Sequence, residues 1–152
     1  METLPIKSLY SPEVYQSIIT RIELVKKDSL PLWGKMDAAQ MFSHCAEVQE
    51  VANGKALENT PFYLKLIKGF VRKAVLNNKP YRKNSPTHPQ YLIKSDSDFD
   101  TEKKRLLDAL AKFIADKDID HPPHPIFGEM TEEERGWGMY KHLSYHLEQF
   151  GV

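Results

Sequence analysis

Two histidines near the end of the chain have the spacing of a metal-binding pair. His142 and His146 stand four residues apart in a segment with helix signals at both ends. Because four residues make about one helical turn, both imidazoles point the same way and could hold one ion between them. Taken alone, such a pair is more often a surface coincidence or two hydrogen-bonded core histidines. A catalytic zinc-type site also needs a third protein ligand.

A helical wheel places this pair at the edge of an apolar arc that includes Met139, Leu143 and Leu147. The two imidazoles are therefore expected to point into or beside the core. The residues expected to face water are Lys141, Ser144, Glu148 and Gln149.

His44 is the candidate third ligand. It lies in the middle of the apolar face of a helix expected to start at Asp37 and to end near residues 53–54. A histidine there is usually a hydrogen-bonded core residue, and burial lowers its pKa and keeps it neutral. A neutral imidazole is also what a metal ion requires. Facing helices of a bundle can supply ligands to one site, but spacing alone does not bring His44 to the pair.

Four further residues are candidates for the surroundings of such a centre. Glu47 lies one turn beyond His44 and could be near the metal, although a surface position suits it equally well. Trp33 could line a pocket, although a large aromatic side chain in a loop more often packs. Gln40 and the loop residue His124 are weaker candidates. No carboxylate stands out as a general base, and the catalytic residues stay unknown.

Capping residues indicate where five helices begin. Each start combines a Ser, Thr, Asp or Pro with an apolar pattern of helical period. Thr131-x-x-Glu134 also forms a capping box. The expected helices run from Ser11-Pro12 to about residue 27, from Asp37 to 53–54, from Pro61 to Leu76, from Asp98 or Asp100 onward, and from Thr131 to Gly151.

Basic side chains mark the third helix, and the longest irregular stretch follows it. The cluster of Lys65, Lys68, Arg72 and Lys73 could bind an anion, but a solvated face with snorkelling side chains is the more usual explanation. Residues 77–98 are rich in Pro, Asn and Ser, which is typical of a binding loop or lid. His88 in this loop is expected to be exposed.

Bulk composition narrows the class of protein. The 152 residues predict a single domain, residues 1–152. The 21 basic and 21 acidic side chains cancel, which gives no reason to expect nucleic acid or an anionic membrane as partner. Cys45 is the only cysteine, so no intrachain disulfide can form. No signal peptide or membrane span is evident, and a cytoplasmic location is expected.

Two runs of sequence resemble the DinB/YfiT-like superfamily, in particular an uncharacterised branch of it. They are LPLWGKMDAAQMFSHC and HPIFGEMTEEERGWGMYKHLSYHLEQFGV. The resemblance implies an all-α fold, a four-helix bundle of up-down-down-up order. The 61–76 helix would then be an extra short element beside it. It also implies a divalent metal on one histidine of the second helix and two of the last, which His44, His142 and His146 match.

This superfamily is described as metal-dependent hydrolases, and some members are transferases that use a low-molecular-weight thiol. The resemblance therefore implies a hydrolase acting on a small molecule. Zinc, nickel and manganese are all possible as its ion, since imidazole ligands do not choose among them. The alternatives are a thiol-dependent transferase, with the thiol held by Arg72, Arg82 or Lys83, and a non-enzymatic helical binding protein whose histidines belong to the core. Several members are dimers, so a homodimer is among the expected partners.

Overall fold

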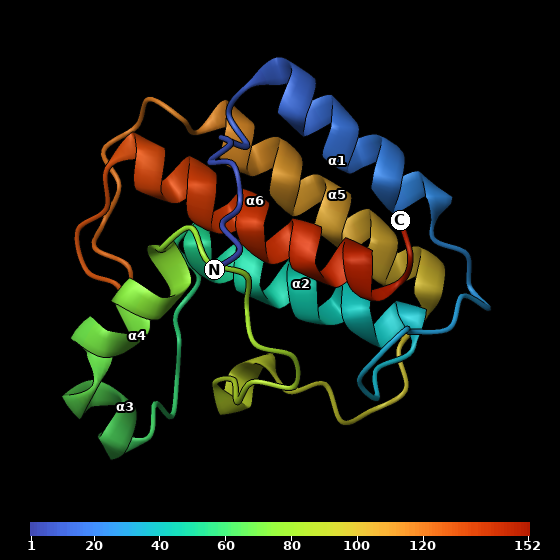
Figure 1. Ribbon diagram of the computed structural model, residues 1–152, viewed down its shortest axis with the longest axis horizontal. Coiled ribbons are helices and arrows are strands. Elements are labelled where there is room, and N and C mark those ends of the chain that lie inside the picture. Colours follow the sequence, from blue (N-terminus) through green and yellow to red (C-terminus); the bar gives the residue numbers. More distant parts are fainter.

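Four long helices lie side by side in the computed structural model, which describes residues 1–152 (Figure 1). They are α1 (Pro12–Leu24), α2 (Ala38–Ala52), α5 (Phe99–Ala115) and α6 (Glu132–Gln149). Three shorter elements follow α2, namely α3 (Phe62–Leu66), α4 (Lys68–Leu76) and the 3-10 turn η1 (Pro89–Tyr91). The chain has no strand, which confirms the all-α prediction.

The long helices run in two opposite directions, and α2 and α5 share one of them. In Figure 1, α1 and α6 run from left to right along the chain, whereas α2 and α5 run from right to left. α2 packs most extensively on α5, and α6 contacts α1, α2 and α4. A single apolar core runs between the four helices, and its largest fully buried members include Ile18, Ile22, Phe42, Leu110 and Leu147.

Asp37, Asp98 and Thr131 cap their helices as expected, whereas Ser11 precedes α1 without a side-chain cap bond. The Asp37 carboxylate accepts from the backbone N–H of Gln40 at 2.8 Å, and the Gln40 side chain accepts from the Asp37 N–H at 3.0 Å. Thr131 and Glu134 form the same reciprocal box at the start of α6. Asp98, not Asp100, caps α5. These side chains satisfy backbone donors that the first helical turn leaves free.

The helical wheel of α6 was wrong about its polar side. Lys141 is 2% exposed, Gln149 is 4% exposed and Ser144 is also buried, whereas Glu148 is exposed as predicted. The reason is that α6 is contacted from several sides, so most of its polar side chains reach partners within the protein. The Lys141 ammonium, for example, donates to the carbonyls of Val75 and Asn77.

The predicted 61–76 helix is divided, and its apolar residues are not buried together. The backbone of Ile67 leaves the helical region, with φ −106° and ψ 15°, and separates α3 from α4. The resulting arm stands outside the four long helices (Figure 1). Phe62, Leu66 and Phe70 are at least 70% exposed.

Two smaller expectations also fail. Helix α1 ends at Leu24, before the predicted residue 27, because Val25 is already extended. His88 is 3% exposed, not solvent-facing, because its ring packs beside Tyr91 and bonds Thr60. None of the helices combines the length and the apolar character that crossing a bilayer requires.

Candidate metal centre

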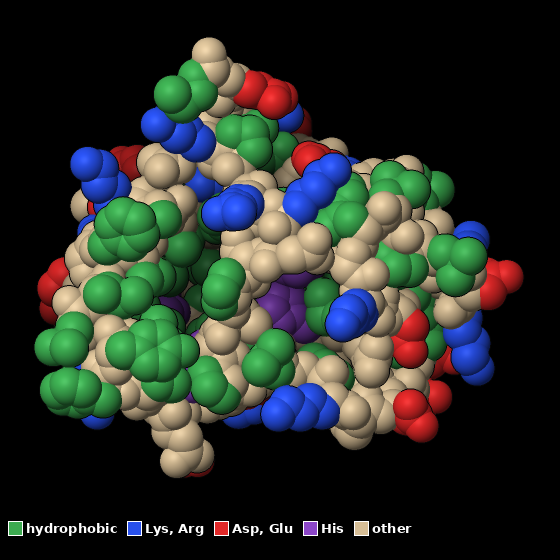
Figure 2. Space-filling view, turned by 60° about the horizontal axis from the view of Figure 1, so that its bottom comes forward, with side chains coloured by type: hydrophobic (Ala, Val, Ile, Leu, Met, Phe, Trp, Pro, Cys, Tyr) green, Lys and Arg blue, Asp and Glu red, His purple; other side chains and the backbone are tan.

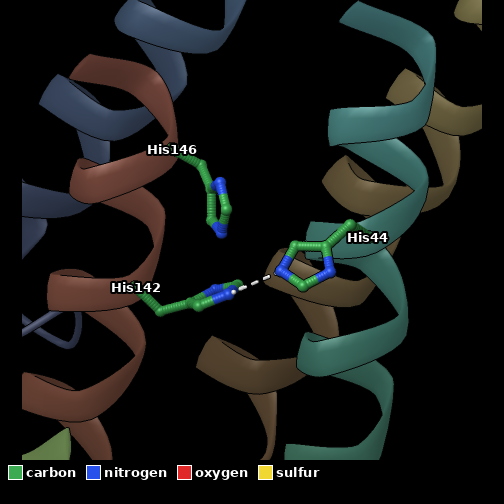
Figure 3. A group of neighbouring side chains, drawn as sticks. All are labelled: His44, His142 and His146. Atoms are coloured by element: carbon green, nitrogen blue, oxygen red, sulfur yellow. Dashed lines mark hydrogen bonds between the residues drawn. The ribbon is translucent and has the colours of Figure 1, made fainter. Parts of the chain in front are cut away.

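Three histidine side chains from two helices converge on one point. His44 projects from α2, and His142 and His146 project from successive turns of α6 (Figure 3). Their candidate ligand atoms all lie within 4.8 Å of one another, close enough to hold a metal ion. His44 and His146 are buried, and His142 is partly buried. The packing of α2 against α6 brings His44 next to His142 and His146, which spacing alone could not predict.

The backbone carbonyl of Tyr91 fixes the tautomer of His44. The distance from His44 Nδ1 to this oxygen is 2.7 Å. Because a carbonyl can only accept, Nδ1 must carry the proton, and a neutral His44 then presents the lone pair of Nε2 to the centre. An oriented imidazole of this kind is typical of metal-binding histidines.

Gln149 fixes the tautomer of His146 in the same way. Its amide nitrogen donates to the carbonyl of Trp33 at 2.7 Å, so its oxygen must face His146 Nδ1, which lies 2.9 Å away. The His146 Nδ1 therefore carries the proton, and Nε2 presents a lone pair to the centre. Gly34 makes room for this arrangement, since a Cβ there would lie 2.4 Å from the Gln149 amide nitrogen.

The donor set fits a divalent cation. Nε2 of His44 and Nε2 of His142 are 3.1 Å apart (Figure 3), and ligands about 2.1 Å from a tetrahedral ion stand roughly 3.4 Å apart. Two lone pairs, from His44 and His146, already point into the group. A proton on His142 could satisfy only one of them well, whereas a cation could accept from all three nitrogens.

The surroundings keep all three imidazoles neutral. Burial lowers the pKa of His44, although the bond to the Tyr91 carbonyl partly opposes this. Burial, together with the charges that His146 and His44 would carry, lowers the pKa of His142 well below its usual value. Burial and the proximity of His44 lower the pKa of His146 to about 3. Neutral rings at ordinary pH have lone pairs available for coordination.

An aromatic group lies beside the histidines. The Tyr145 ring is 5.1 Å from the His146 ring, edge to face, and Tyr81 lies 5.4 Å from Tyr145 on centroid distances. The Trp33 indole donates to the Tyr145 hydroxyl at 3.3 Å. Trp33 therefore contacts two residues that lie against His146: its indole bonds Tyr145, and its backbone carbonyl accepts from Gln149.

Glu47 is engaged elsewhere, although it is only 8% exposed. Its carboxylate pairs with Lys55 and Arg105 and accepts from the Gln90 amide at 2.9 Å. Burial raises its pKa, but these three donors outweigh burial and lower it. Glu47 therefore holds the segment around η1 on α2, which places the Tyr91 carbonyl on His44.

The other two candidates do not reach the triad. The Gln40 side chain takes part in the cap of α2 and also donates to the carbonyl of Ser95. His124 lines a separate cavity of about 180 Å³ with Met139 and Arg135. Its Nδ1 accepts from two backbone N–H groups of its own loop.

Sequence reasoning missed Gln149 and Tyr91, the two residues that orient His146 and His44. Gln149 follows His146 by three residues, and that spacing places both on one helix face, so a signal existed. Tyr91 acts through its backbone carbonyl, which no residue type could have indicated.

A family model described as "Protein of unknown function (DUF1569)" matches residues 9–151. The chain belongs to this family. Comparison with curated proteins and with solved structures found no match for this DUF1569 member. The matched range includes all three histidines and both orienting residues.

Imidazole atoms reach the surface on one face of this DUF1569 protein. Figure 2 shows histidine side chains in a hollow near the centre of that face, bordered by hydrophobic, Lys and Arg side chains. A centre with three protein ligands leaves coordination positions for small molecules. Because His142 is only partly buried, the arrangement is chemically suited to metal-assisted reactions of a small molecule.

Proposed function

We propose that this protein is a divalent-metal-dependent hydrolase acting on a small molecule, with His44, His142 and His146 as the metal ligands. The observation that carries the proposal is the pair of fixed lone pairs, on His44 and His146, directed at a common point beside His142. In a purely structural cluster, buried acceptor nitrogens are paired with hydrogen-bond donors. Here Nε2 of His44 and Nε2 of His146 are both acceptors, and His142 can donate at most one proton to them.

We also propose that the fold is the DinB-like bundle of up-down-down-up order and that the chain is related to the DinB/YfiT-like superfamily. The opposed directions of α1 and α6 against α2 and α5 support this order (Figure 1). So does the origin of the ligands, one from α2 and two from α6. The arm formed by α3 and α4 is then an addition to the bundle, and a cytoplasmic location fits the single buried Cys45.

A divalent cation at this centre would supply a Lewis acid with positions open to water or substrate. The side chains of this protein orient and shield it. Tyr91 and Gln149 hold two ligands in the required tautomer, and Tyr145 covers one side of His146. We propose that Glu47 takes no part in proton transfer, because both its oxygens are bound by Lys55, Gln90 and Arg105.

A transferase that uses a low-molecular-weight thiol is the second candidate. The Lys83 ammonium lies 4.3 Å from the Trp33 ring centroid, beside the aromatic group, and forms no ion pair. It could hold the carboxylate of a thiol cosubstrate. Arg72 is unsuited to this role, because Glu134 and the carbonyls of Phe127 and Glu129 occupy its guanidinium.

Metal analysis of protein purified without a histidine tag tests the centre. We expect about one divalent ion per chain, and zinc, nickel and manganese are to be compared by reconstitution because imidazole ligands do not choose among them. The single variants His44→Ala, His142→Ala and His146→Ala should each lose most of the metal. His121→Ala is the matched control and should keep it. Unchanged metal content in all three ligand variants would show that the three histidines hold no ion.

Turnover separates the two enzymatic candidates. The reconstituted protein is to be assayed on a panel of small esters, amides and electrophiles, with and without added thiol. Hydrolysis that needs no thiol supports the hydrolase, and turnover only with thiol supports the transferase.

A further inference from the structure

The balanced net charge conceals a strongly basic segment. Residues 59–95 contain eight of the 21 basic residues and none of the 21 acidic ones. The segment therefore carries a charge of +8, and the remainder, with thirteen basic against 21 acidic residues, carries −8. The eight residues are Lys65, Lys68, Arg72, Lys73, Lys79, Arg82, Lys83 and Lys94.

Almost none of this charge is neutralised within the protein. Arg72 is the only one of the eight that forms an ion pair, with Glu134 at 2.7 Å. Lys68 donates to a backbone carbonyl, that of Pro125. Lys65, Lys68 and Lys73, on α3 and α4, are all exposed. This part of the surface therefore presents an uncompensated positive field to an anionic partner.

The same helices carry a contiguous exposed apolar surface, the apolar ridge. Its exposed fractions run from 43% to 75%, and its members are Phe62, Tyr63, Leu66, Ile67 and Phe70. Since an aromatic side chain can bury about 150–250 Å², the ridge offers on the order of 500 Å² of surface, at the upper end for a typical monomer. Figure 2 shows hydrophobic side chains gathered at the left edge, the side on which α3 and α4 lie in Figure 1.

The ridge is held away from the core by the opposite side of α4. The Trp137 indole donates to the carbonyl of Leu76 at 3.0 Å, and Lys141 donates to the carbonyl of Val75 at 2.9 Å. Arg72 is tied to the start of α6. These bonds fix α4 on α6, so the apolar ridge cannot turn inward without breaking them.

We propose that the α3–α4 arm docks on an anionic lipid surface, with the apolar ridge in the headgroup region and the neighbouring lysines on the phosphates. Helices that lie in a membrane interface combine large apolar side chains on one face with Lys and Arg around them. A convex ridge enters a lipid surface without needing a matching groove. Pairing with the same arm of a second copy would instead bring two unneutralised basic segments together.

Vesicle sedimentation with the intact protein tests this proposal, and it does not depend on the metal centre. We expect binding to vesicles that contain phosphatidylglycerol in phosphatidylcholine, little binding to pure phosphatidylcholine, and weaker binding at high salt. Replacing Lys65→Gln and Lys73→Gln together should weaken partitioning about 25-fold, at about fivefold per basic residue. No binding of the natural sequence to anionic vesicles would overturn the proposal.

Variants of the apolar ridge complete the test. The triple variant Phe62→Ser, Leu66→Ser and Phe70→Ser should lose at least about tenfold in partitioning. Leu24→Ser, Leu30→Ser and Ile119→Ser form the control, since these apolar residues are also exposed, by 54% to 82%, outside the apolar ridge, and this variant should bind normally. Equal losses in both triple variants would overturn the proposal. A monomer–dimer equilibrium that only the ridge variant abolishes, without vesicle binding, would assign the surface to a second copy. If the ridge variant does not fold, the lysine variant decides.

Discussion

Gln149 shows how one side chain can determine the chemistry of a neighbouring ligand. It links the loop before α2 to His146, because its nitrogen donates to Trp33 and its oxygen accepts from the imidazole. With its oxygen in place, His146 has only one tautomer available when neutral. A residue that was expected to face water therefore orients one of the three histidines.

Replacing Gln149 by Leu should weaken metal binding. His146 would lose its acceptor and the carbonyl of Trp33 its donor, and loss of such a partner typically costs about 10–100-fold in metal affinity. Competition with a chromophoric chelator measures the change. Gln49→Leu is the matched control, because Gln49 is also buried, on α2, and its side-chain oxygen has no partner. Equal affinities of the two variants would contradict the role assigned to Gln149.

His124, which lies outside the triad, should make the free energy of unfolding depend on pH. Burial lowers its pKa to about 4, against about 6.5 in the unfolded chain. Between about pH 4 and pH 6.5 the unfolded state therefore binds more protons than the folded state. The contribution of neutral His124 to the unfolding free energy is fully present above about pH 6.5 and is lost as the pH falls toward 4. Protonation would also end its acceptance of two backbone N–H groups.

The variant His124→Asn should flatten this dependence. An Asn side chain can still accept from the loop backbone but does not titrate in this range. Between pH 7 and pH 4.5 the unfolding free energy of the variant should fall by about 1–2 kcal/mol less than that of the natural sequence. The difference is this small because His124 is partly exposed. Urea denaturation at each pH measures it. His121→Asn, in the same loop, is the control, and an equal flattening there would contradict the assignment.

At the scale of elements, most caps could be predicted, whereas the burial of the polar side chains of α6 could not. Asp37, Asp98 and Thr131 act through local bonds within one helical turn, so the residue types alone indicate them. The polar side of α6 and the apolar ridge depend on what packs against each helix. A wheel assumes that polar residues face water, and α6 violates this because several elements surround it.

The loop between α1 and α2 offers a test of such tertiary positioning. Gly34 has φ +84°, and a Cβ there would strike the Gln149 amide. Gly34→Ala should destabilise the fold by about 1–2 kcal/mol through backbone strain and should also weaken metal binding by displacing Gln149. Gly54→Ala shares the positive φ, +112°, but meets nothing within 4 Å. Gly54→Ala should therefore lower the thermal stability without weakening metal binding. If it weakened metal binding as much as Gly34→Ala, the proposed effect of Gly34 through Gln149 would be contradicted.

For the whole molecule, residue type and spacing could predict the three histidines as candidates, but could not predict that they lie close together. His44 lies 98 positions before His142, and only the resemblance to a known superfamily placed them together before the structure did. Net charge gave no sign of how the charges are distributed along the chain. A total of zero argued against anionic partners, yet the charges are separated into a basic segment and an acidic remainder.

Because the histidines of the proposed centre lie on both α2 and α6, metal binding there should stabilise the entire fold. A ligand present at about 100 times its Kd adds roughly 2.7 kcal/mol to the unfolding free energy. For a chain of this length, that raises Tm by about 5–10 °C. Calorimetry of chelator-treated protein, before and after adding one divalent metal at a time, measures the shift. The metal that gives the largest shift at equal concentration binds most tightly. His44→Ala should abolish the shift, since α2 then no longer contributes a ligand, and a shift that persists would place the ion elsewhere in the molecule.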